Sequence, residues 1–218
     1  MARRDELRAS PPMFQNPVLD FFTRVHPVVP PIIFVPVIVV LFIGAFDRLS
    51  VVGTLGLALA GYVFWTLFEY WLHRLVFHFE PEKGIGARLH WMIHGVHHDH
   101  PNDPLRLVMP PSVSVPLALL LFWLYTVILG FGPALGFTAG FLTGYLAYDM
   151  LHYHVHHHQP RSALGQRLRE LHMRHHFQDH ERGFGISAPY WDRVFGTLPH
   201  ATGNRPLERP QHDPSQAR

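Results

Sequence analysis

Four long segments without a charged residue restrict this chain to few folds. They cover residues 27–46, 51–68, 112–129 and 134–148. Crossing the hydrocarbon core of a bilayer takes a helix of about 20 apolar residues, and a helix satisfies its own backbone hydrogen bonds there. A chain of 218 residues is too short to enclose four such helices in a soluble shell. The sequence therefore predicts an all-α integral membrane protein with four transmembrane helices, at about 27–46, 51–72, 112–129 and 133–151.

Short turns pair these helices into two hairpins. Asp47–Ser50 separates the first two runs, and Gly130–Pro133 separates the last two. Lysine and arginine near membrane helices favour the cytoplasmic side. They gather in the N-terminal segment, the central loop and the C-terminal region, whereas Arg48 lies at the other end of its hairpin. We therefore expect the N-terminus, both histidine-rich regions and the C-terminus of this multi-pass protein in the cytoplasm.

The same pattern divides the chain into three parts. Residues 1–26 are predicted as an N-terminal cytoplasmic segment, residues 27–198 as the membrane domain and residues 199–218 as a polar tail. Within the membrane domain the histidine-rich regions are 73–111 and 152–198. The last run has glycines at four-residue spacing, which allow close helix contact in lipid or reflect the frequency of glycine in membrane helices: Gly132, Gly136, Gly140 and Gly144.

Histidine is the second dominant feature, with 19 in the chain. Both histidine-rich regions contain a spaced pair followed by H-x-x-H-H. Residues three and four apart share a face of a helix, so each triplet can aim two or three ring nitrogens at one point. Neutral imidazole is the commonest metal ligand, and ten are too many for one ion but suit two. We predict a two-metal centre in a cytoplasmic helical cap, with the ligands His73, His78, His94, His97, His98, His152, His156, His172, His175 and His176.

Other side chains in these regions are candidates to support the metals. The chain has no cysteine, and a site of imidazoles with nearby carboxylates suits Fe, Zn, Cu or Ni. Glu69 and Asp149 precede His73 and His152 by one helical turn, where each can accept the distal N–H of a ligating imidazole or simply be an acid at a helix end. Further histidines are either ligands, hydrogen-bonding partners of ligands or solvated side chains: His90, His154, His157, His158 and His180.

At these histidines the sequence resembles the fatty acid hydroxylase / sterol desaturase superfamily of integral-membrane di-iron enzymes, and within it the fatty acid 2-hydroxylases. The resemblance covers about residues 55–198 and runs in the family's order. It maps the family's metal ligands onto the ten histidines named above. The matching segments are E-Y-W-L-H-R-L-V-F-H, H-G-V-H-H, Y-D-M-L-H-Y-H-V-H, L-H-M-R-H-H-F, G-F-G-I-S and W-D-R-V-F-G-T.

The resemblance implies a mono-oxygenase that uses O2 to hydroxylate a fatty acyl chain, at carbon 2, in a free fatty acid or a sphingolipid. It implies two Fe2+ ions for activity, with Zn2+ able to occupy the site in isolated protein, and no catalytic residue beyond the metal centre. Eukaryotic 2-hydroxylases usually carry an N-terminal haem domain, whereas about 26 residues precede the first run here. We therefore expect a separate electron donor, of the ferredoxin or cytochrome b type, and a bacterial inner membrane as the location.

Other interpretations of the sequence stay open. A sterol or carotenoid hydroxylase or desaturase of the same superfamily uses the same metals. A metal transporter is expected to place ionisable residues inside its spans, and the four runs contain none. A non-catalytic membrane protein with structural zinc is a third possibility. Nucleic acid is not an expected partner, because the net charge is only +2 with histidine neutral.

Overall fold

The computed structural model describes residues 5–81 and 83–200, and all the regular structure in these ranges is helical. It forms two compact units. The bundle unit comprises Phe14–Phe68 and Pro104–Tyr153, and the histidine unit comprises the described residues of Met1–Met13, Glu69–Asp103 and His154–Arg218. The predicted tail 199–218 lies almost wholly outside the described residues. The helices are α2 (Pro17–Phe21), α3 (Val29–Phe46), α4 (Val51–Leu72), α5 (Gly84–His90), α6 (Val96–Asp99), α7 (Pro111–Leu129), α8 (Phe131–His157), α9 (Ala163–Phe177) and α10 (Tyr190–Val194), with π-helical turns η1 (His73–Phe77) and η2 (Trp91–Gly95).

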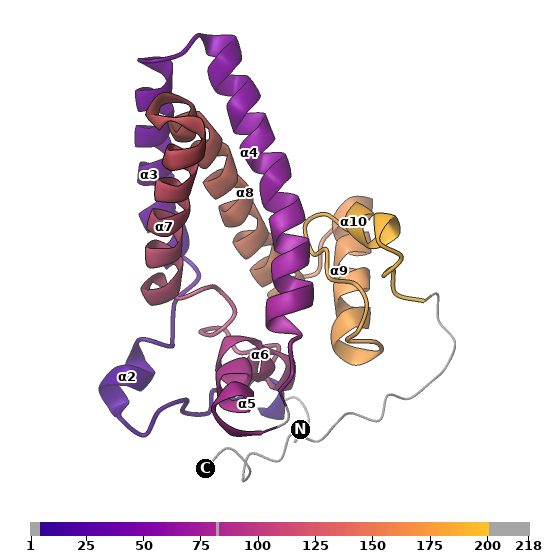
Figure 1. The fold of residues 1–218 in the computed structure, drawn as a ribbon. Helices are drawn as coiled ribbons and strands as arrows, with labels where there is room; N and C mark the ends of the chain where they lie inside the picture. The colour runs from indigo at the N-terminus through magenta and orange to yellow at the C-terminus, as the bar shows by residue number, and fades with distance from the viewer. Residues whose placement is uncertain (1–4, 82, 201–218) are drawn as a thin grey trace. The chain divides into compact units, whose positions relative to one another are not determined.

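The bundle unit contains the predicted membrane helices. Figure 1 shows that short turns join α3 to α4 and α7 to α8. Aromatic side chains connect the helices across the core: Phe34 of α3 packs on Tyr145 of α8, and Trp65 of α4 packs on Phe141 of α8, each with ring centroids 5.1 Å apart. The predicted helix bounds match α3, α4 and α7 within two residues, whereas α8 continues six residues beyond its predicted end.

Three helical segments are long and apolar enough to cross a membrane among the described residues: Val29–Phe46, Val51–Phe77 and Pro111–Leu129. The fourth predicted span, in α8, is long enough but is not among them. The reason is its composition, because α8 contributes small and aromatic side chains to the inside of the bundle. Ala134, Ala139 and Phe141 are buried there, whereas α3 and α7 expose large aliphatic side chains.

The predicted glycine face lies against α4. A Cβ atom added to Gly140 would overlap the backbone of Ala58, and one added to Gly61 of α4 would overlap the backbone of Phe137. The two helices therefore touch backbone to backbone, which larger residues would prevent. Gly136 and Gly144 also face α4, whereas Gly132 lies beside the α3–α4 turn.

The N-terminal segment packs against residues that follow it by about 80 to 95 positions. Asn16 caps the short helix α2 by accepting a hydrogen bond from the backbone N–H of Val18. In the bundle unit, buried Asp20 forms ion pairs with Arg24 (3.0 Å) and Arg106 (3.1 Å). In the histidine unit, the backbone N–H of Asn102 donates to the carbonyl of Leu7. Segment 1–26 is therefore shared between the two units.

Candidate metal centre

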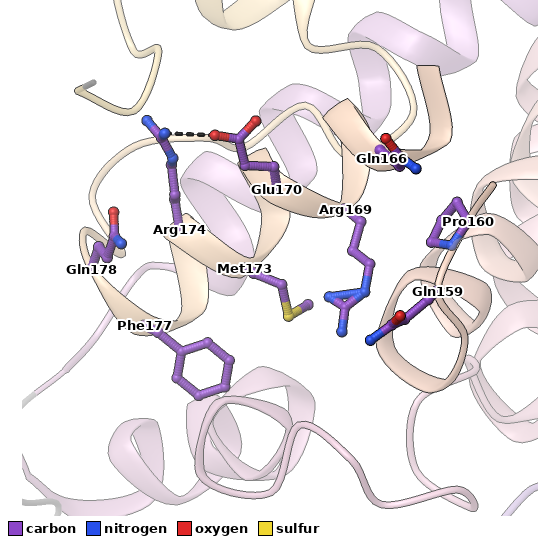
Figure 2. Close-up of a pocket in the computed structure, with 9 residues that line it drawn as sticks. All are labelled: Gln159, Pro160, Gln166, Arg169, Glu170, Met173, Arg174, Phe177 and Gln178. Carbon is purple, nitrogen blue, oxygen red and sulfur yellow. Dashed lines mark hydrogen bonds and ion pairs between the residues drawn. The ribbon is translucent and has the colours of Figure 1, made fainter. Parts of the chain in front are cut away.

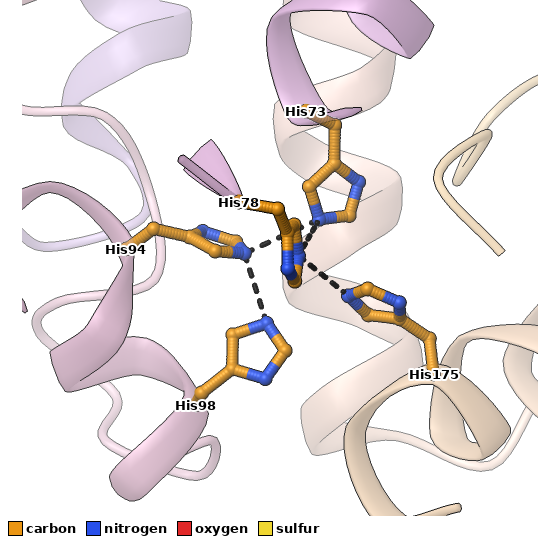
Figure 3. A group of neighbouring side chains, drawn as sticks. All are labelled: His73, His78, His94, His98 and His175. Carbon is orange, nitrogen blue, oxygen red and sulfur yellow. Dashed lines mark hydrogen bonds between the residues drawn. The ribbon is translucent and has the colours of Figure 1, made fainter. Parts of the chain in front are cut away.

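The ten predicted ligands form two clusters of five. Within each cluster one ring nitrogen per residue lies within 4.8 Å of all the others. The first cluster, drawn in Figure 3, contains His73, His78, His94, His98 and His175. The second cluster contains His97, His152, His156, His172 and His176. His152 and His156 occupy consecutive turns of α8, which runs without a break from the bundle unit into the histidine unit.

A π-helical turn explains how His73 and His78 reach the same point. In an α-helix of 3.6 residues per turn, positions five apart differ by roughly 140° in direction. Here the chain closes an i→i+5 turn, because the N–H of His78 donates to the carbonyl of His73 at 3.2 Å. Such π-turns occur often at functional sites. The wider turn brings the Nε2 atoms of the two rings to 3.2 Å.

The middle histidine of each triplet joins the cluster that holds the outer histidines of the other triplet. In each triplet the outer residues are four apart and point the same way, while the middle residue points elsewhere. His94 and His98 join the first cluster, and their neighbour His97 joins the second. His172 and His176 join the second cluster, and their neighbour His175 joins the first. Each triplet helix therefore holds both clusters, which adjoin where the rings of His98 and His176 lie 4.4 Å apart.

The spacing of the ring nitrogens fits a bound metal. Ligands bound to one ion at about 2.0–2.1 Å lie about 3 Å from one another. In the first cluster the Nε2 atoms of His73, His94 and His98 follow one another at 3.2 and 2.9 Å. In the second cluster His172 lies 2.7 Å from His156 and 3.1 Å from His176 by the same atoms. Lone pairs that converge in this way are satisfied by a cation.

Backbone carbonyls fix the orientation of two ligands. Nδ1 of His73 donates to the carbonyl of Phe184 at 2.8 Å, and Nδ1 of His175 donates to that of Arg182 at 2.7 Å. A proton on Nδ1 leaves Nε2 free to bind a metal. Hydrogen bonds behind the ligands are usual at metal sites. Here the loop between α9 and α10 supplies them.

Two buried carboxylates hold that loop. Glu69 accepts hydrogen bonds from the backbone N–H and the hydroxyl of Ser187. Asp192 accepts from the N–H groups of Phe184 and Gly185, both at 2.9 Å. A Cβ at Gly185 would come within 2.5 Å of the carbonyl of Ala188, so the loop has no room for a side chain there.

The sequence predicts that Glu69 accepts the distal N–H of a ligating imidazole. In the structure Glu69 accepts hydrogen bonds from Ser187 of the α9–α10 loop, and the Phe184 carbonyl of that loop accepts the N–H of His73. Asp149 accepts a hydrogen bond from the N–H of Met109 at 3.3 Å, within the bundle unit. This bond attaches the segment before α7 to α8. Glu69 and Asp149 both accept hydrogen bonds from backbone N–H groups, and neither is among the possible metal-ligating groups.

Burial favours the neutral form of several cluster imidazoles by lowering their pKa values. It lowers the pKa of His97 to about 3. Burial first, and neighbouring histidines second, hold the pKa values of His94, His98 and His176 well below the usual range. Neutral imidazole is the form that binds metals, so these rings need not lose a proton at neutral pH.

The five additional histidines of these regions lie outside the two clusters and differ in their contacts. Nε2 of buried His90 lies 2.7 Å from the carbonyl of Phe77, so His90 supports the π-turn rather than joining a cluster. His180 stacks on His78 with ring centroids 6.4 Å apart. His154 is exposed and stacks on His158 at 5.0 Å, and neither they nor His157 belongs to a cluster.

A groove of about 590 Å³ lies along α9 (Figure 2). Met173 and Phe177 line it together with polar residues of α9 and of the segment before it. Glu170 accepts from Arg174 at 2.6 Å at its edge. The groove holds none of the ten cluster histidines.

A family model described as fatty acid hydroxylase matches residues 58–197. The chain belongs to the fatty acid hydroxylase family. The match covers most of the chain and includes all ten histidines of the two clusters. The family predicted from the sequence is confirmed.

Named relatives of this family align along most of the chain. A dihydroceramide fatty acyl 2-hydroxylase of Arabidopsis thaliana is 39% identical over 191 residues, covering 87% of this chain and 80% of the relative. A ceramide very long chain fatty acid hydroxylase of Saccharomyces cerevisiae is 36% identical, covering 87% of this chain and 50% of the relative. The solved structure of full-length scs7p, with only its hydroxylase domain visible, superposes with a TM-score of 0.82 at 35% identity, covering 90% of this chain and 74% of that one.

Sequence reasoning missed the residues that orient the ligands. Asp192, Ser187 and the carbonyls of Arg182 and Phe184 carry no spacing signal that links them to His73 or His175. The segments G-F-G-I-S and W-D-R-V-F-G-T were noticed only as part of the family resemblance. Their repeated glycines were the available signal of a tightly packed loop.

Proposed function

We propose that this chain is a membrane-bound dimetal mono-oxygenase that hydroxylates a fatty acyl chain at carbon 2. The observation that carries the proposal is the pair of five-imidazole clusters within the family match. The names of the relatives support the position and the substrate class, because they describe fatty acyl 2-hydroxylases and ceramide hydroxylases. The substrate is accordingly a fatty acyl chain, free or amide-linked in a sphingolipid.

The proposed metals are two Fe2+ ions, one for each cluster. All-imidazole sites accept Fe or Zn, so isolated protein can carry Zn2+ without activity. Bound iron supplies the redox chemistry that activates O2 at the expense of two electrons from a separate donor of the ferredoxin or cytochrome b type. The family gives no role to a protein nucleophile, and no cysteine is present to serve as one.

The chain's own residues hold and orient the metals. His73 and His175 keep their Nδ1 protons on backbone carbonyls and direct Nε2 into the first cluster. The rings of both clusters are largely buried, which limits the access of water to the reaction.

Lipid mass spectrometry tests the proposal. Membranes from cells that express this chain are compared with membranes from cells that express His175→Ala, with His154→Ala as a control outside both clusters. A gain of one oxygen atom at acyl carbon 2 with the wild type and His154→Ala, but not with His175→Ala, is expected. Unchanged acyl chains despite two bound irons and a supplied reductant would contradict it, and an oxidised sterol or carotenoid would favour the other branch of the superfamily.

A further inference from the structure

The helix that carries the first triplet has its polar side inside and its apolar side outside. Segments α5, η2 and α6 follow one another without a break from Gly84 to Asp99. The side chains of His90, His94 and His97 are buried on one side. On the other side Ile85 is 81% exposed and Ile93 is 54% exposed. This is the reverse of a helix on the surface of a soluble protein, where the exposed face is polar.

Leu89 lies between these two positions and is 47% exposed. Positions 85, 89 and 93 are successively four apart and therefore form one stripe along the helix. Single exposed apolar residues are common, but a continuous patch of them marks an interaction surface.

Helix α9 carries the second triplet and has the opposite character. Leu168 and Leu171 are buried on its ligand side. Beyond Leu164 in its first turn, which is 70% exposed, its outer side exposes Gln166 and Arg167 and carries the groove of Figure 2. Arg167 pairs with Glu170 at 2.9 Å, and Arg174 pairs with Glu170 at 2.6 Å. The two triplet helices thus present different outer faces, one apolar and one suited to water.

Exposed apolar side chains also occur just before the stripe in the sequence, at the end of a membrane-span candidate and beyond it. The candidate Val51–Phe77 ends with the exposed residues Leu75 and Val76. Phe79, which follows that end in the sequence, is 69% exposed. Lys83 and Arg88 are exposed beside the stripe, and basic side chains next to an apolar face are attracted to lipid phosphates.

We propose that these residues form a bilayer-contacting surface, named here the apolar ridge: Leu75, Val76, Phe79, Ile85, Leu89 and Ile93. Its partner is the lipid itself, with the aliphatic side chains among the acyl chains and the two basic residues at the phosphate level. Because His94 lies on the other side of the same helix, the ridge brings acyl chains to within one helix thickness of the first cluster. This last consequence rests on the proposed function, whereas the contact with lipid does not.

Spin labels measure the contact independently of activity. The chain has no cysteine, so single substitutions Ile85→Cys, Leu89→Cys and Ile93→Cys give unique labelling sites. The matched controls are Gln166→Cys and Arg167→Cys on α9 and Gln178→Cys at its C-cap. Each labelled full-length protein, loaded with metal, is placed in phosphatidylcholine–phosphatidylglycerol bilayers. Power saturation then compares access of oxygen, which dissolves in lipid, with access of a polar nickel complex.

Labels on the ridge are expected to be more accessible to oxygen than to nickel, and labels on α9 the reverse. Nickel access on the ridge equal to that on α9 would overturn the proposal. Low access of both reagents on the ridge would also overturn it, because a second protein copy would then cover the surface.

The functional consequence has its own measurement. Ile85→Glu is expected to keep both metals and to lower hydroxylation of bilayer lipid at least tenfold, while Gln166→Glu keeps wild-type activity. Full activity of Ile85→Glu would refute a role of the ridge in substrate access. A wild-type protein that shows the expected spin-label pattern but hydroxylates no lipid would refute the proposed function and leave the ridge in place.

Discussion

At the scale of single residues, the exchange of His97 and His175 ties the two clusters together. A residue three positions along a helix points roughly 60° to one side of the first, and a residue four positions along points roughly 40° to the other. His97 and His98 therefore diverge by about 100° and enter different clusters. Each triplet supplies two imidazoles to one cluster and one to the other, so neither cluster depends on a single helix.

This exchange predicts which metal each substitution affects. His97→Ala removes a ligand from the second cluster only, so metal content is expected to fall from two ions per chain towards one, with hydroxylation lost. His94→Ala should do the same at the first cluster. His154→Ala, which alters an exposed histidine outside both clusters, should keep two metals. Elemental analysis of purified variants measures this, and complete loss of both metals from His97→Ala would show that the clusters do not bind separately.

Asp192 offers a second prediction at this scale. Its carboxylate holds the loop whose Phe184 carbonyl accepts the His73 proton. Asp192→Asn replaces one acceptor oxygen by a donor, and a lost buried hydrogen bond to a charged group costs about 1–3 kcal/mol. We expect a lower unfolding temperature and faster loss of the first metal to a chelator. Glu170→Gln is the control, because its pairs with Arg167 and Arg174 lie on the exposed side of α9 and contribute about 0–1 kcal/mol each. Equal metal loss from both variants would contradict this role of Asp192.

At the scale of elements, the sequence predicted the helices and histidine groups that follow from the pattern of neighbouring residues. Uncharged runs located α3, α4 and α7, and the spacing of the triplets located their ligands. The π-turn at His73 was missed because α-helical periodicity places residues five apart on different faces. The spacing of five was itself the signal. The exchange of His97 and His175, and the role of the α9–α10 loop, depend on the approach of segments about 80 to 120 residues apart and have no local signature.

The contact of α4 with α8 gives a prediction at this scale. Gly140→Ala would place a Cβ against the backbone of Ala58, and overpacking of this kind costs about 1–3 kcal/mol. The expected result is a lower unfolding temperature in detergent or bilayers. Gly56→Ala is the matched control, because nothing lies within 4 Å of its added Cβ and alanine favours a helix over glycine by roughly 0.5–1 kcal/mol. An unchanged stability of Gly140→Ala would mean that the helices separate easily.

At the scale of the whole molecule, the connectivity of the chain bears on the number of spans. Residues 5–13, most of the first histidine region and most of the second belong to one compact unit, and we predict that this unit lies on one side of a membrane. The chain must then cross an even number of times between them. Candidate spans α3 and α4 satisfy this before the first region. Between the two regions α7 is one crossing, and α8 is the helix available for the return, although its own composition is less apolar.

This connectivity predicts a four-span topology that chemical labelling can test. In the cysteine-free chain, Asp47→Cys lies in the α3–α4 turn and Phe131→Cys at the first residue of α8, next to the α7–α8 turn, and both positions are exposed. A membrane-impermeant maleimide should label them from the side opposite to Gln159→Cys, which reports the histidine unit. If the positive-inside rule holds, Gln159→Cys reacts only from the cytoplasm. Labelling of Phe131→Cys and Gln159→Cys from the same side would mean that α8 does not cross, and that α7 then cannot cross either.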